Sequence, residues 1–147
     1  MMASRSDAAE YAMRALHAPG FVAAVSAAGC LSVTTLDGER LAMTSPEFSA
    51  YVESVFRAQN RIATELAFAL ETGEFDSAGS ARLESAESEL LVACAGLNEI
   101  AAERRDGRAR GRLGQAEVAR QAPECERATR DAEAALASIR EQAAYGD

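Results

Sequence analysis

The chain has 147 residues, a length that fits one folded domain, and it carries a formal net charge of −8. A chain this acidic repels nucleic acid, so we expect no nucleic-acid partner. All fifteen basic residues are arginine and the single histidine is His17, so few side chains are suited to general-base or amine catalysis.

A short apolar run near the N-terminus ends in small side chains directly before Cys30. An apolar segment of this kind is the pattern of a cleavable secretory signal. The four residues Ala27-Ala28-Gly29-Cys30 resemble the lipobox of bacterial lipoproteins, with Ala27 where those proteins usually carry leucine. The resemblance implies that residues 1–29 are a removed signal peptide and that a lipid on Cys30 attaches the protein to a membrane.

The residues before the apolar run suggest where translation starts. Asp7 and Glu10 offset Arg5 and Arg14, whereas a signal peptide begins with a positive segment. A start at Met13 removes both acidic residues, so we expect Met13 to be the true first residue.

The residue that follows Cys30 indicates to which membrane the protein would be sorted. In Gram-negative lipoproteins this residue influences sorting, and aspartate there favours retention at the inner membrane. Here it is Leu31. The resemblance therefore implies an outer-membrane lipoprotein that faces the periplasm, an inference that does not apply to a Gram-positive source.

The N-terminal residues also allow a different interpretation. Residues 6–17 have the apolar spacing of an amphipathic helix, which Pro19 and Gly20 would end. Residues 21–33 are too few to span a bilayer and would then be a buried segment. In this alternative the protein is a cytoplasmic helical adaptor or dimerising protein, and residues 1–30 belong to its fold.

Residues 30–44 are expected to be the lipidated cysteine and an extended tether that holds the helical domain, residues 45–147, away from the membrane. The Asp37-Gly38 pair is a turn signal. A short strand or hairpin is therefore the alternative for this segment.

Three amphipathic helices are predicted after the tether, over residues 46–71, 77–105 and 123–144. Ser45 and Pro46 are typical of a helix start, and Gly73 of a helix end. Apolar or small residues, with one glutamine, recur at steps of mostly three and four: Phe48, Val52, Val55, Gln59, Ile62, Leu66 and Ala69; Leu83, Ala86, Leu90, Ala93, Leu97 and Ile100; Cys125, Ala128, Ala132, Ala135, Leu136, Ile139 and Ala143. The fold class is therefore all-α, either a three-helix antiparallel bundle or a long helical hairpin with a third helix against it.

The segment expected to join the second and third helices is the one basic stretch of this acidic chain. It contains five arginines: Arg104, Arg105, Arg108, Arg110 and Arg112. Guanidinium groups bind carboxylates and phosphates, so one interpretation is contact with an acidic envelope protein, a cell-wall polymer or lipopolysaccharide. The other is a solvated loop whose first arginines complement the negative end of the second helix.

Cysteine counting connects the anchor with the helical domain. Once Cys30 carries a lipid, Cys94 and Cys125 remain as a pair, and an oxidising periplasm favours a disulfide between them. In the cytoplasm they would more often be buried thiols. Neither cysteine lies in a metal-ligand or redox spacing, so no metal or cofactor is expected.

The sequence predicts a binding or structural protein of the cell envelope and no enzyme. Two carboxylates are enough for glycoside chemistry, and Glu84 and Glu87 lie one helical turn apart. A glycan-active enzyme is therefore the less favoured alternative, because exposed glutamates on a helix usually form a solvated face. Partner, ligand and oligomeric state are not specified by any motif.

Overall fold

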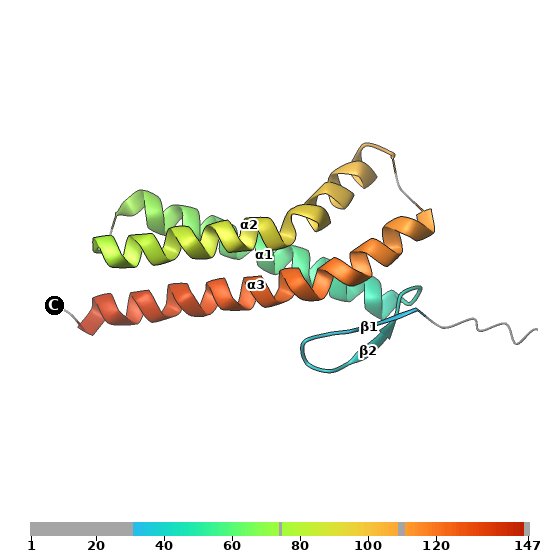
Figure 1. Ribbon diagram of the computed structural model, residues 1–147, viewed down its shortest axis with the longest axis horizontal. Helices are drawn as coiled ribbons and strands as arrows, with labels where there is room; N and C mark the ends of the chain where they lie inside the picture. Colours follow the sequence, from blue (N-terminus) through green and yellow to red (C-terminus); the bar gives the residue numbers. More distant parts are fainter. Residues whose placement is uncertain (1–30, 74, 109–110, 146–147) are drawn as a thin grey trace, which may run out of the picture.

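The computed structural model describes residues 31–73, 75–108 and 111–145. Three long helices make up most of this region, and a small β-hairpin packs against them (Figure 1). The elements are β1 (Ser32–Thr34), β2 (Arg40–Ala42), α1 (Pro46–Thr72), α2 (Ser77–Arg105) and α3 (Gly111–Tyr145). The predicted all-α, three-helix fold is confirmed.

The ends of α1 and the start of α2 are set by local capping. The Ser45 hydroxyl accepts a hydrogen bond from the Phe48 amide at 3.1 Å, with Pro46 in the first turn. Gly73 ends α1 in the left-handed conformation, with φ of 64°. The Asp76 carboxylate accepts from the Gly79 amide at 2.7 Å and caps α2. Both helices therefore lie within one residue of their predicted bounds.

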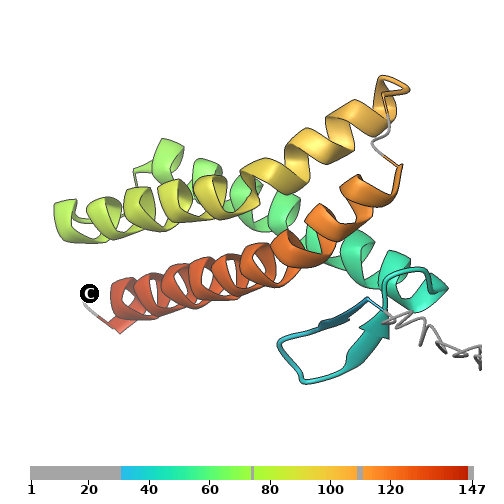
Figure 2. The same ribbon diagram turned by 45° about the vertical axis from the view of Figure 1, so that its right-hand side comes forward.

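Helices α2 and α3 run side by side and bend in the same direction, while α1 crosses them (Figures 1 and 2). Gly96 lies where α2 meets α3, and a Cβ at this position would overlap the side-chain amide of Gln121. Glycine therefore allows Gln121 to lie across α2.

The prediction that the third helix begins at Pro123 was wrong, because α3 begins twelve residues earlier at Gly111. Pro123 lies inside the helix, although proline removes one backbone hydrogen bond there. Val118 and Ala122 are almost fully buried on the face that packs against the other helices. Their burial stabilises the start of α3 as a helix, although the glycines and arginines of this segment are typical of a loop.

The extended tether predicted for residues 30–44 is also corrected, because residues 31–43 form a hairpin that belongs to the folded body. Val33 pairs with Leu41 across the two antiparallel strands, and both side chains are buried against Met43 and the helices. Asp37-Gly38 does form the turn, with Gly38 at φ of 83°. The alternating burial of the strands gives the hairpin an apolar face that packs on α1 and α3.

Most residues of the predicted apolar rows are buried or partly buried in the core, whereas Ala143, near the end of α3, is exposed. Ile62, Leu66, Leu83, Leu90 and Leu136 are its largest fully buried aliphatic side chains. Within the described ranges no helix is long and apolar enough to cross a membrane.

Candidate functional site

The arginines predicted as one loop are divided among three parts of the fold. Arg104 and Arg105 belong to the last turn of α2 and are exposed. Arg108 follows the helix and pairs with Asp106 at 2.7 Å. Arg110 lies outside the described residues, and of Arg112 only its place in the first turn of α3 is described. The predicted loop is thus shorter than expected, because α3 takes up its second half.

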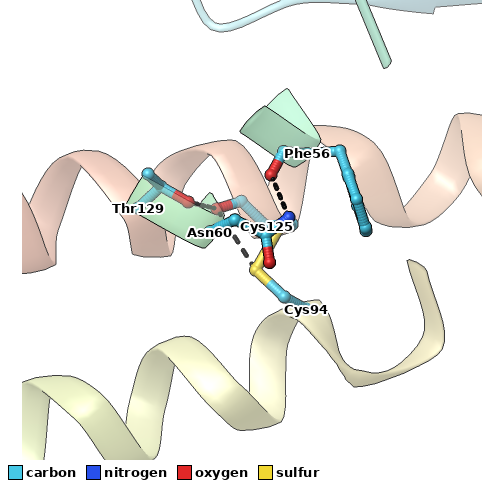
Figure 3. Close-up of a disulfide and its surroundings, with 5 residues drawn as sticks. All are labelled: Phe56, Asn60, Cys94, Cys125 and Thr129. Carbon is cyan, nitrogen blue, oxygen red and sulfur yellow. Dashed lines mark hydrogen bonds between the residues drawn. A yellow bond between two sulfur atoms is a disulfide. The ribbon is translucent and has the colours of Figure 1, made fainter. Parts of the chain in front are cut away.

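Cys94 and Cys125 form a disulfide between α2 and α3, with an S–S distance of 2.08 Å (Figure 3). Both residues are fully buried. Two side chains drawn beside it bind backbone carbonyls: the Thr129 hydroxyl donates to the Cys125 carbonyl at 2.7 Å, and the Asn60 amide donates to the Phe56 carbonyl at 2.8 Å. The disulfide thus joins the helices where all three come together. Cys30, the predicted lipidation site, lies outside the described residues.

A groove of about 360 Å³ lies between the first half of α1, the second half of α2 and the start of α3. Its walls are mostly apolar. We call it the apolar groove; it is lined by Ser49, Val52, Glu53, Phe56, Leu97, Ile100, Ala101, Arg104 and Val118. Its size and partly apolar lining make it a candidate site for a small ligand.

The two ends of the groove differ in polarity, although Glu53 lies beside Val52 between them. Helices α1 and α2 run antiparallel (Figure 1), so Ser49 near the start of α1 lies toward the Arg104 end of α2. Phe56 and Leu97 lie toward the other end, and Figure 3 shows Phe56 beside the disulfide. The groove therefore has a polar end at Ser49 and Arg104, which we call its mouth, and an apolar end at Phe56 and Leu97.

The two charged side chains of the groove differ in whether they form an ion pair. The Glu53 carboxylate is paired with Arg57 one turn along α1. Arg104, in contrast, has no ion pair with another described residue. The positive end of α1 also lies on this side, and it is complemented by Glu47 in the first turn, whose pKa is lowered by hydrogen bonds from the Glu47 backbone amide and from Ser45. Arg104 is therefore the charged residue of the groove lining that has no ion pair with another described residue.

A separate polar cluster fastens the hairpin to the helices. The Glu126 carboxylate accepts hydrogen bonds from the Tyr51 hydroxyl at 2.8 Å, from Arg130 at 2.6 Å and from the Leu36 amide at 3.4 Å. Arg130 also forms an ion pair with Asp37 at 3.0 Å. The side chain of Glu126 is only 13% exposed, so this cluster holds the turn of the hairpin against α1 and α3.

The two carboxylates considered for glycoside chemistry do not form a site with the groove. Glu84 is exposed and Glu87 half-buried on α2, and neither lines the groove. No group of three potential metal ligands occurs in the part of the chain that the structure describes.

Comparison with protein-family models, with curated proteins and with solved structures finds no match to this chain. The functional argument therefore depends on the residues themselves. The groove was not predicted from sequence, although three of its lining residues, Val52, Leu97 and Ile100, belong to the predicted apolar rows. The other indication of a groove in the sequence was Phe56, a large apolar residue that lies beside the predicted apolar row on α1.

Proposed function

We propose that this protein is a small lipid-anchored protein of the bacterial cell envelope, attached through Cys30, whose helical body binds another molecule or has a structural role. The Cys94–Cys125 disulfide is the observation that carries the proposal. Disulfides are typical of oxidising compartments such as the periplasm and are rare in the cytosol. The pairing also leaves Cys30 as the odd cysteine, and Cys30 is the residue that ends the lipobox-like Ala27-Ala28-Gly29-Cys30.

The position of Cys30 relative to the folded body adds a second argument. The hairpin begins at Ser32, so an acyl group on Cys30 would lie two residues from β1. The hairpin is held by the cluster around Glu126 and by burial of Val33 and Leu41. An anchor at this place would therefore hold the helical body close to the membrane. With a formal net charge of −8, the protein is not expected to bind a membrane through a basic surface, so acyl chains would have to provide the attachment.

Membrane fractionation of the wild type and of Cys30→Ser tests the proposal. The wild type should sediment with membranes and the variant should not, because serine cannot form the thioether. Thr44→Ser, an equally small change at an exposed residue of the described chain, should behave as the wild type. The envelope proposal is contradicted if the wild type stays in the cytoplasmic fraction, the result expected for the helical adaptor.

Intact mass of the membrane-extracted protein provides an independent measurement. Cleavage before Cys30 removes residues 1–29, acylation adds mass to Cys30, and reduction of the disulfide adds about two daltons. A chain that retains residues 13–29 and lacks acyl mass would contradict the anchor, even if the disulfide is present.

A further inference from the structure

The outward face of α2 carries an exposed apolar patch in the middle of the helix. Leu91 is 51% exposed and Val92 is 76% exposed, although the opposite face of the same helix contributes Leu83, Leu90 and Leu97 to the core. Residues 90–98 include no charged side chain. Adjoining apolar side chains in water are typical of a surface that another molecule covers.

Residues with the spacing of a coiled coil extend this patch along α2. Two rows of outward residues recur at seven-residue intervals, and all of them are exposed or half-buried: Ala81, Ser88, Ala95 and Ala102 in the first row; Glu84, Leu91, Asn98 and Arg105 in the second. The side chains of the first row are all small, so another helix can approach α2 closely. The face is thus suited to a helix that lies along α2 for about 30 Å, at 1.5 Å per residue.

The charges at the two ends of this face complement each other. Glu84 precedes the apolar patch and Arg105 follows it, and both side chains are exposed. Arg105 approaches Asp106 only at 3.9 Å, so its guanidinium group can also bind a second carboxylate. If α2 pairs with the same helix of a second copy in the antiparallel direction, Glu84 lies near Arg105 of that copy. Two-fold symmetry repeats the contact at the other end, so the face matches a second copy of itself.

The charges also determine the direction of the pairing. With Leu91 beside Ala95 of the second copy, Glu84 lies within one helical turn of Arg105 of the second copy, which is within reach of the arginine side chain. A parallel pairing would place Glu84 against Glu84 and Arg105 against Arg105, and like charges at these positions repel. The antiparallel arrangement therefore covers the apolar patch and pairs opposite charges at both ends.

From this arrangement we propose that the protein forms an antiparallel homodimer through the outward face of α2. A strip about 30 Å long and about 10 Å wide is smaller than the roughly 800 Å² that each partner buries in a standard interface. We therefore expect a dimer that dissociates at micromolar concentration. The interface consists of described residues of α2 and does not require a lipid on Cys30, so the two proposals stand or fall separately.

Sedimentation velocity ultracentrifugation of the full chain with Cys30→Ser tests the proposal. This variant has neither the thiol that would receive a lipid nor one that could link two chains through residue 30, so any association is non-covalent. We expect the mass of one chain at low protein concentration and of two chains at high concentration. A monomer at every concentration up to about 1 mM would overturn the proposal.

A charge introduced into the patch should prevent the pairing. Val92→Glu should weaken dimerisation at least about tenfold, because two carboxylates would meet near the two-fold axis. The matched control Phe68→Glu introduces the same charge at an apolar residue of α1 that is 62% exposed, and it should dimerise as before. Circular dichroism confirms that each variant remains helical. A dimer that Val92→Glu does not weaken would use another surface and would contradict the proposal.

Exchange of the end charges tests the direction of the pairing. Glu84→Arg alone or Arg105→Glu alone places like charges together at both ends, and each should weaken self-association by about tenfold. A mixture of these two single variants should form a heterodimer, because each end then joins opposite charges. The double variant should likewise form a homodimer about as stable as that of the parent protein. If the mixture and the double variant associate as weakly as each single variant, the antiparallel pairing is wrong.

Discussion

Arg130 on α3 holds Asp37 in the turn of the hairpin through two hydrogen bonds, each of 3.0 Å. The two residues are 93 positions apart in the sequence. Arg130 also donates to Glu126 at 2.6 Å, so one guanidinium group joins the hairpin to the buried end of the cluster on α3. This contact orients the hairpin that follows Cys30.

The Asp37–Arg130 contact predicts an acid-sensitive hairpin. Hydrogen bonds from Arg130 and its charge lower the pKa of Asp37 below the ordinary value of 3.8. A carboxylate with a lowered folded-state pKa stabilises the fold above its unfolded pKa, and this stabilisation is lost as pH falls through the folded value. We expect the protection of the Thr35 and Gly38 amides, measured as hydrogen exchange relative to the intrinsic rate at the same pH, to fall below about pH 4.

Asp37→Asn is the matched variant for this prediction. Its Thr35 and Gly38 amides should be less protected than those of the wild type at pH 7, and their protection should change less between about pH 5 and pH 3. Because both charged groups are exposed, high salt should reduce the difference between variant and wild type. Equal exchange rates at pH 7 in low salt would show that the ion pair does not hold the turn.

Tyr51 predicts a separate sensitivity at alkaline pH. Burial raises its pKa, and the Glu126 carboxylate, which accepts a hydrogen bond from the Tyr51 hydroxyl, raises it further. A group with a raised folded-state pKa contributes stability that is fully present below the unfolded value, about 10 for tyrosine, and lost as pH rises toward the folded value. The free energy of unfolding should therefore fall above about pH 10. Tyr51→Phe should be less stable than the wild type at pH 7, by about 1 kcal/mol for the lost hydrogen bond.

Denaturant unfolding at pH 7 and pH 11 measures this effect. The difference between the two pH values should be smaller in Tyr51→Phe than in the wild type, because phenylalanine has no proton to lose. An equally large alkaline loss in both proteins would mean that other groups cause it.

Gly96 and Gln121 provide a test of the α2–α3 contact. Alanine is favoured over glycine inside a helix by about 1 kcal/mol, but a Cβ at Gly96 must displace the Gln121 amide. Gly96→Ala should therefore gain little or lose stability in the wild type. In a Gln121→Ala background the same change should stabilise the protein by up to about 1 kcal/mol. A double-mutant cycle from urea unfolding measures the coupling, and additive effects would contradict it.

The sequence was sufficient to predict the features that depend on neighbouring residues. Ser45, Pro46 and Gly73 act through local hydrogen bonds and backbone conformation, so the bounds of α1 and α2 were predictable. The start of α3 was not, because burial of Val118 against distant helices outweighs the unfavourable Pro123. The other features that depend on contacts between distant residues could not be predicted from the sequence either.

The hairpin and the groove illustrate this limit. Asp37-Gly38 indicated a turn, but nothing local indicated that Arg130 would hold it. Apolar spacing identified the buried faces of α1 and α2. It did not show that Val52, Ile100 and Val118 leave a groove between the helices with Arg104 at its mouth, since that depends on how three faces diverge.

The disulfide prediction concerns the stability of the helical body. Cys94 and Cys125 are 31 residues apart, and the chain-entropy model assigns a loop of this length about 3–4 kcal/mol. The double variant Cys94→Ala and Cys125→Ala should therefore unfold at lower denaturant concentration by about this free energy. Because both side chains are fully buried, alanine also leaves small gaps between α2 and α3.

Unfolding of the reduced wild type separates these two effects. Reduction removes the covalent link and keeps both sulfur atoms, so the difference between the oxidised and reduced wild type measures the link itself. The further loss in the alanine variant measures packing. If the reduced and oxidised proteins unfold at the same denaturant concentration, the disulfide does not stabilise the bundle. The paired helices would then depend on contacts such as that of Gln121 with Gly96.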